Sequence, residues 1–224
     1  MKRALRDNGL SLAFGLLFLA ALVGQAFAGQ ADFNDRQLAQ GAEQVTLIDY
    51  VTSSDFGVDV VENWQSEYLQ FFLYIFGTVW LVQRGSPESK NLDEAGLESD
   101  RAQKVGRFAG PESPRWAATA DWRTTVFSRS LGLLMGGIFL LSWAVMSVAG
   151  WAAYNAERLG QRQDAVSWLS YVGSADFWNR TLQNWQSELL AVGSMAIFAV
   201  FLRQRGSPES KPVGDPHTTT ADTG

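Results

Sequence analysis

The chain has 224 residues, a net charge of −5 and no cysteine. The lack of cysteine excludes disulfides, thiol nucleophiles, iron–sulfur clusters and thiolate metal sites, and an acidic chain without a basic stripe is a poor match for a nucleic-acid partner. The one histidine, His217, lies in a tail, residues 212–224, that is predicted to be disordered. We therefore predict no catalytic residue, no cofactor site and no metal site.

The first apolar block covers residues 10–28 and predicts a membrane span over about residues 9–28. About 20 apolar residues in a helix cross a ~30 Å hydrocarbon core. A cleavable signal peptide is the alternative, because Lys2, Arg3 and Arg6 precede the block and Ala26, Phe27 and Ala28 end it.

The polar segment after this block has helical spacing. Its apolar residues predict a short outer amphipathic helix, and a matching set occurs later in the chain: Leu38, Val45, Ile48 and Val51, then Leu159, Val166, Leu169 and Val172. Ser53 or Ser54, and later Ser174, are typical N-caps. Each predicts a helix that runs unbroken into the next apolar block.

The second apolar block, residues 68–82, is shorter and predicts a span over about residues 66–83. Runs of this kind can also be buried or re-entrant helices, but Trp64 suits the headgroup region and Arg84 can reach the opposite interface. Residues 91–122, mixed in charge and rich in Gly, Pro, Ala and Ser, predict a cytoplasmic linker.

The third and fourth apolar blocks predict spans over about residues 131–153 and 187–203, flanked for the fourth by Trp185 and Arg203. The third block contains Gly132 and Gly136, a small-xxx-small pattern that lets helices approach closely in lipid. This pattern predicts packing between the two halves or a homo-oligomer.

An internal repeat organises these blocks. Shifting the sequence by 121 residues aligns residues 50–90 with 171–211 without a gap, and 21 of the 41 positions are identical. The predicted organisation is therefore repeat 1 (residues 1–90), the linker, repeat 2 (residues 123–211) and the tail. Because each repeat has two spans, both copies cross the membrane in the same direction. The predicted fold class is all-α, a polytopic membrane protein of four helices.

The basic residues predict the orientation. Of the 18 lysines and arginines, 14 lie in the N-terminal segment, in residues 83–130 or after residue 202, and 4 lie in the two loops between spans. By the positive-inside rule, both termini and the linker are cytoplasmic.

The sequence Asn-Trp-Gln-Ser-Glu occurs in each repeat at the predicted outer boundary. Its polar side chains could form a paired site for a cation or a headgroup. The alternative is structural, with tryptophan at the interface and polar groups that fix helix ends or helix packing. With two nearby aspartates, the candidate outer cluster comprises Asp55, Asn63, Trp64, Gln65, Glu67, Asp176, Asn184, Trp185, Gln186 and Glu188.

The sequence Gln-Arg-Gly-Ser-Pro-Glu-Ser-Lys occurs in each repeat at the predicted inner boundary. Arginine, glycine and proline in this order are typical of a helix end. The functional alternative is a lipid-phosphate or partner contact through four basic residues, Arg84, Lys90, Arg205 and Lys211.

These two doubled motifs, separated in each repeat by an apolar helix, resemble an uncharacterised family of small bacterial integral membrane proteins that carry a domain of unknown function. The resemblance covers nearly the whole chain. It implies four spans in a bacterial plasma (inner) membrane, and it supplies no activity or catalytic residue.

We expect a non-enzymatic membrane protein that interacts with lipid or with other membrane proteins through its outer layer. The predicted spans contain no Asp, Glu, Lys, Arg or His between their boundary residues, which argues against a proton-coupled transporter. A small transporter or channel for a neutral or weakly polar solute is the alternative. An enzyme that uses Asp55 and Glu67 at the outer face is a third hypothesis.

Overall fold

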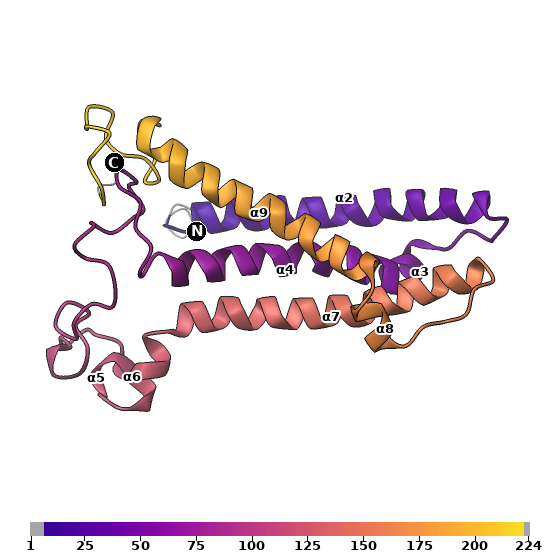
Figure 1. The fold of residues 1–224 in the computed structure, drawn as a ribbon, viewed down its shortest axis with the longest axis horizontal. Coiled ribbons are helices and arrows are strands. Elements are labelled where there is room, and N and C mark those ends of the chain that lie inside the picture. Colours follow the sequence, from indigo (N-terminus) through magenta and orange to yellow (C-terminus); the bar gives the residue numbers. More distant parts are fainter. Residues whose placement is uncertain (1–6, 222–224) are drawn as a thin grey trace. The chain divides into compact units, whose positions relative to one another are not determined.

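The computed structural model describes residues 7–221, and every regular element in that part of the chain is a helix (Figure 1). The all-helical fold class predicted from the sequence is thus confirmed. The chain divides into two compact units. Unit 1 contains the residues up to Val61 together with Val145–Val172, and unit 2 contains Glu62–Ala144 together with the residues from Gly173 onward.

Two helices, α2 (Gly9–Ala39) and α7 (Ser130–Gly160), are long and apolar enough to cross a membrane among the residues described. Each has 31 residues, about 46 Å at a rise of ~1.5 Å per residue. They contain the spans predicted at residues 9–28 and 131–153 and continue beyond them. No residue of α2 is buried within the protein, so its apolar surface is suited to contact with lipid.

The predicted outer amphipathic helices are only partly correct. Leu38 lies in the last turn of α2, and Val45 lies in the loop that follows. Only residues 47–51 form a separate helix, α3 (Leu47–Val51). Val45 stays outside a helix because its backbone groups bond to the Asn34 side chain. Asn34 accepts from the Val45 amide at 2.8 Å and donates to the Val45 carbonyl at 3.0 Å. The same geometry recurs 121 residues later, before α8 (Trp168–Val172): Asn155 binds both backbone groups of Val166, at 2.9 and 3.0 Å.

Tyrosines of these short helices anchor unit 1. Tyr50 and Tyr171 are each 1% exposed, and each ring lies against a glycine of a long helix. A Cβ at Gly29 would lie 2.9 Å from Cζ of Tyr50, and one at Gly150 would lie 3.1 Å from Cζ of Tyr171. Glycine is therefore required at both positions for the tyrosine ring to pack against the helix.

The two remaining long helices begin where the serine N-caps predict. In α4 (Ser54–Gly77) and α9 (Ala175–Phe201), the amide of the third residue after the cap donates to Ser53 or Ser174 Oγ, at 3.3 Å in both. Both run unbroken into the next apolar block, as predicted, but α4 ends at Gly77 and α9 at Phe201, before the predicted span ends at residues 83 and 203. Their N-terminal halves carry charged and amide side chains, so only their C-terminal halves are continuously apolar.

Aromatic side chains form the core of unit 2 beside α9. The ring centroid of Trp143 in α7 lies 6.0 Å from the ring centroids of both Phe177 and Trp185. Its indole N–H donates to the Thr181 hydroxyl at 3.4 Å. Gly136 has a specific role here, because a Cβ would come within 3.0 Å of the Phe72 ring. The small-xxx-small pattern therefore accommodates an aromatic ring at Gly136, while Gly132 has no neighbour within 4 Å of a Cβ.

The predicted linker is irregular apart from η1 (Gly106–Phe108) and α5 (Arg115–Ala118), and it is followed by α6 (Trp122–Phe127). Residues 212–221 pack against residues of unit 2, for example through a 3.2 Å contact of His217 Nδ1 with the Val200 carbonyl, whereas residues 222–224 lie outside the described part of the chain.

Candidate functional site

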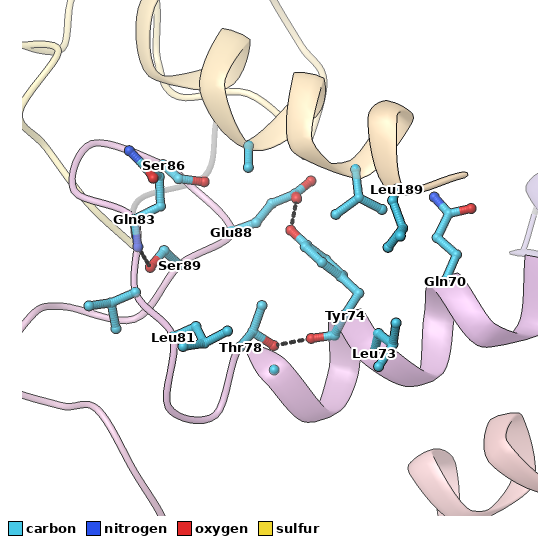
Figure 2. A pocket seen from close by; sticks show the side chains of 14 residues that line it. Gln70, Leu73, Tyr74, Thr78, Leu81, Gln83, Ser86, Glu88, Ser89 and Leu189 are labelled. Carbon is cyan, nitrogen blue, oxygen red and sulfur yellow. Dashed lines mark hydrogen bonds between the residues drawn. The ribbon is translucent and has the colours of Figure 1, made fainter. Parts of the chain in front are cut away.

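A cavity of about 290 Å³ opens in unit 2 between the C-terminal half of α4, the loop that follows it and α9 (Figure 2). Most of its walls are apolar side chains, and a few polar groups lie toward the loop. The lining residues are Gln70, Leu73, Tyr74, Gly77, Thr78, Leu81, Val82, Gln83, Ser86, Glu88, Ser89, Leu189, Val192 and Ala196.

The loop that closes this cavity is the first Gln-Arg-Gly-Ser-Pro-Glu-Ser-Lys sequence. A turn brings the Ser86 amide to the Gln83 carbonyl at 3.1 Å, with Gly85 at φ +87°, the left-handed conformation that glycine adopts without strain. Ser89 Oγ then accepts from the Gln83 amide at 2.8 Å. The helix-end interpretation is corrected, because α4 has already ended at Gly77 and this glycine shapes a separate turn.

The second copy of the sequence forms the same turn. Ser207 bonds to the Gln204 carbonyl at 3.2 Å, Gly206 has φ +82°, and Ser210 Oγ accepts from the Gln204 amide at 2.9 Å. Two serines and a glycine thus specify one local structure at both places. The cavity, however, is lined by the first copy only.

One carboxyl group points into the apolar cavity. Glu88 accepts a hydrogen bond from the Tyr74 hydroxyl of α4 (Figure 2). Glu209, the equivalent glutamate of the second copy, also reaches Glu88. A hydrogen bond to Glu88, then its negative charge, then burial raise the pKa of Glu209 above the usual glutamate value. The cavity thus contains one carboxyl group and a phenol, and a second carboxyl group lies beside the first from outside the lining.

The basic residues predicted at the inner boundary have different surroundings. Lys211 is 1% exposed, and its ammonium donates to the carbonyls of Gly85, Pro216, His217 and Thr219 at 2.5–3.4 Å. Lys90 pairs with Glu98 at 3.0 Å. Both lysines are engaged within the protein, whereas the two predicted arginines, Arg84 and Arg205, are exposed.

A further arginine, Arg203, ends α9. Its guanidinium donates to the Val200 carbonyl at 3.1 Å and the Leu202 carbonyl at 2.8 Å, and it reaches the Asp215 carbonyl at 3.1 Å. A cation at a helix C-terminus satisfies the last carbonyls and opposes the helix dipole. This residue therefore fixes the tail against α9.

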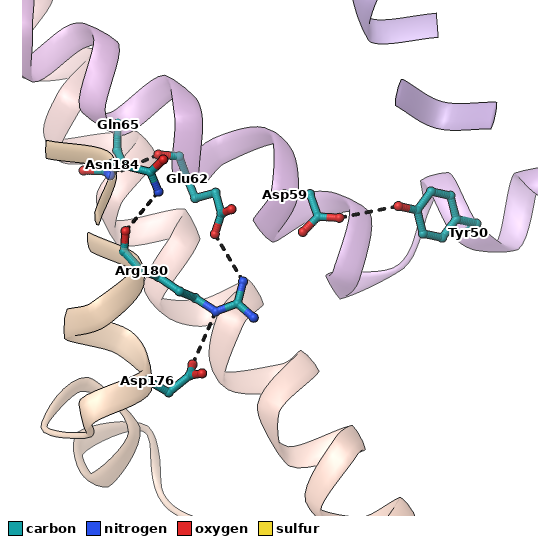
Figure 3. A network of polar contacts seen from close by, with 7 residues as sticks. All are labelled: Tyr50, Asp59, Glu62, Gln65, Asp176, Arg180 and Asn184. Atoms are coloured by element: carbon teal, nitrogen blue, oxygen red, sulfur yellow. Dashed lines mark hydrogen bonds and ion pairs between the residues drawn. The ribbon is translucent and has the colours of Figure 1, made fainter. Parts of the chain in front are cut away.

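At the predicted outer boundary, part of the polar cluster forms a network within unit 2 (Figure 3). Gln65 is fully buried and accepts from the Trp185 indole at 2.7 Å. Arg180 pairs with Glu62 at 3.2 Å and with Asp176 at 3.4 Å, and its carbonyl accepts from Asn184 at 2.9 Å. These contacts join α4 to α9 and favour the structural interpretation of the motif.

Other residues of the predicted outer cluster lie at the surface. Asn63, Trp64, Glu67 and Gln186 are exposed, and Glu67 and Glu188 lie close enough to repel each other. Asp55 belongs to unit 1 and lies in the first turn of α4.

Another polar contact of unit 1 joins Tyr50 to Asp59 at 3.5 Å (Figure 3). Burial and then the Asp59 charge raise the pKa of the Tyr50 phenol. The contact connects α3 to the N-terminal part of α4 and leaves the tyrosine ring seated against its glycine.

Sequence reasoning missed the groups that matter at the cavity. Tyr74 interrupts the second apolar block, but a search for Asp, Glu, Lys, Arg and His in the spans passes over it. Glu88 and Glu209 lie in the doubled inner motif, where attention fell on the basic residues. Arg180 and Glu62 lack repeated counterparts of the same kind, so the internal repeat gave no signal for them.

No group of three or more His, Cys, Asp or Glu side chains suited to a metal occurs within residues 7–221. No curated protein and no solved structure matches the chain. A family model, Domain of unknown function (DUF6766), matches residues 1–222. The chain therefore belongs to the DUF6766 family of proteins with a domain of unknown function.

Proposed function

We propose that this chain is a non-enzymatic, multi-pass protein of the plasma membrane that binds a small amphiphile or part of a lipid in the cavity of unit 2. In this proposal α2, α4, α7 and α9 all cross the membrane, as two tandem parallel repeats with both termini in the cytoplasm. The observation that carries the binding function is the mostly apolar cavity with a few polar groups in its lining.

In this proposal the apolar parts of α4 and α9, residues 68–77 and 189–201, lie in the hydrocarbon core. Trp64 and Trp185 then lie at one interface, and Arg84 and Arg203 reach the other. The tandem arrangement is supported by contacts that recur at an offset of 121 residues, such as Asn34 with Val45 and Asn155 with Val166.

The size and chemistry of the cavity support an amphiphilic ligand. Ligand pockets are mostly apolar, with a few placed polar groups that fix orientation. A volume of 290 Å³ holds about ten non-hydrogen atoms at ~30 Å³ each. A whole lipid is too large, but an eight-carbon chain with a polar head fits.

The test uses the lack of native cysteine. In the reconstituted chain, Gln83→Cys places a thiol on the cavity wall, and Gln204→Cys places one in the same turn of the second copy, which does not line the cavity. We expect n-octanol to slow the reaction of a neutral maleimide with the first variant and not with the second. Equal slowing at both positions would reflect solution in the bilayer and would refute the cavity as a binding site.

The alternative, passage of a neutral or weakly polar solute, is favoured by the proximity of Glu67 and Glu188, which could form an outer mouth. Solute flux into vesicles that contain the chain, lost when both residues are replaced by alanine, would support this function. Flux that is the same with and without the chain would exclude it for the solute tested.

A further inference from the structure

The polar end of the cavity is acidic. Glu88 lines the cavity and is held by the Tyr74 hydroxyl, and Glu209 approaches from the second copy of the loop. The remaining lining residues are apolar or uncharged. Among the lining residues, a ligand therefore meets Glu88 and the Tyr74 phenol as ionisable groups, and Glu209 lies beside Glu88.

No basic side chain of residues 7–221 lies within ion-pair distance of Glu88 or Glu209. The nearby cations are engaged elsewhere: Lys211 by four backbone carbonyls, Lys90 by Glu98, and Arg203 by the end of α9. Carboxylates at partly buried positions are stabilised by an opposite charge. The protein does not supply that charge here, so a ligand can.

We propose that the ligand of this cavity is a cationic amphiphile, a protonated amine on a chain of about eight carbons. The ammonium would bind at Glu88 and Tyr74, with Glu209 beside it, and the chain would lie against Leu73, Leu81, Leu189 and Val192. The inference rests on the proposed function, because it names the class of ligand for the same cavity.

The site has a defined pH dependence. Tyr74 comes from α4, Glu88 and Glu209 come from the two loops, and α9 contributes only apolar side chains to the lining. An ammonium gains from negative charge at this site, so its affinity falls as the pH drops and Glu209, whose pKa is raised, loses its charge. An uncharged octyl compound gains nothing from ionisation, and its binding should not follow this titration.

The test compares three probes of equal length, n-octylammonium, n-octanol and octanoate, by protection of Gln83→Cys in the reconstituted chain. Charge-assisted hydrogen bonds are roughly twice as strong as neutral ones, so we expect half-maximal protection at about tenfold lower concentration for octylammonium than for octanol. Octanoate should protect least. Gln204→Cys controls for accumulation of each probe in the bilayer.

Two further variants separate charge from folding. Glu88→Gln should strongly reduce the preference for octylammonium while octanol still protects. Glu112→Gln, which changes an exposed carboxyl group outside the cavity lining, should retain the preference. Equal protection by octanol and octylammonium in the unmodified site would overturn the cationic ligand and leave the proposed function standing. Protection by none of the probes would overturn both.

Discussion

Residues 83–90 and 204–211 have the same sequence and the same turn, yet their side chains serve different purposes. Glu88 lines a cavity and Glu209 is exposed, while Lys90 makes a part-exposed ion pair and Lys211 is buried among carbonyls. Local sequence determines the backbone in both copies, and the surrounding helices and tail decide what each side chain does. The predictions below test where the two copies are equivalent and where they are not.

The largest difference is expected between the two lysines. The Lys211 ammonium donates to backbone carbonyls, and Lys211→Met would leave these carbonyls without a donor. Each buried unsatisfied group costs ~1–3 kcal/mol. We expect a loss of about 3 kcal/mol in the free energy of unfolding. Lys90→Met should cost under ~1 kcal/mol, as for other exposed pairs. Denaturant unfolding of both variants in detergent measures this, and equal losses would contradict the assigned roles.

The glycines against the two tyrosines should behave alike. Gly29→Ala and Gly150→Ala each place a methyl group against a buried ring, and overpacking costs ~1–3 kcal/mol. We expect the free energy of unfolding of both variants to fall by about 2 kcal/mol. Gly132→Ala, with nothing near its Cβ, is the control and should be neutral or slightly stabilising. A large effect at only one tyrosine site would show that the copies differ there.

The outer motifs should differ by a smaller amount. Gln65→Ala leaves the Trp185 indole without its acceptor, at a cost of ~1–2 kcal/mol. The equivalent change, Gln186→Ala, affects an exposed side chain and should stay within ~0.5 kcal/mol. Thermal unfolding followed by near-ultraviolet circular dichroism compares them, and Gln65→Ala as mild as Gln186→Ala would count against the network.

The smallest effect concerns pH. Because the pKa of Glu209 is raised in the folded protein, its folded form binds the proton more tightly than the unfolded chain does. This contribution is present at low pH and is lost as the pH rises from the ordinary value of 4.5 through the raised pKa. Glu209→Gln should therefore flatten a slight fall in melting temperature over that range. An unchanged slope would contradict the raised pKa of Glu209.

Much of the fold follows from the sequence, because its signals are local. Continuous apolar blocks located the long helices, and the serines at 53 and 174 located the starts of α4 and α9. The predicted outer amphipathic helices are shorter than expected because Asn34 and Asn155 bind the backbone of the loops before them. Each contact joins residues 11 positions apart, which no helical pattern encodes. The cavity could not be predicted, since it depends on how α4, the loop that follows it and α9 come together.

The proposed four-span topology is tested most directly by single cysteines at exposed positions in intact cells with a membrane-impermeant thiol reagent. Ala42→Cys and Gln163→Cys lie in equivalent loops of the two copies, and Ala102→Cys and Thr218→Cys lie in the linker and tail. The account predicts labelling of the first two and, until the cells are opened, protection of the last two. Labelling of Ala102→Cys or Thr218→Cys in intact cells would show that α4 or α9 does not cross or that the first segment is cleaved, and would contradict the parallel four-helix arrangement.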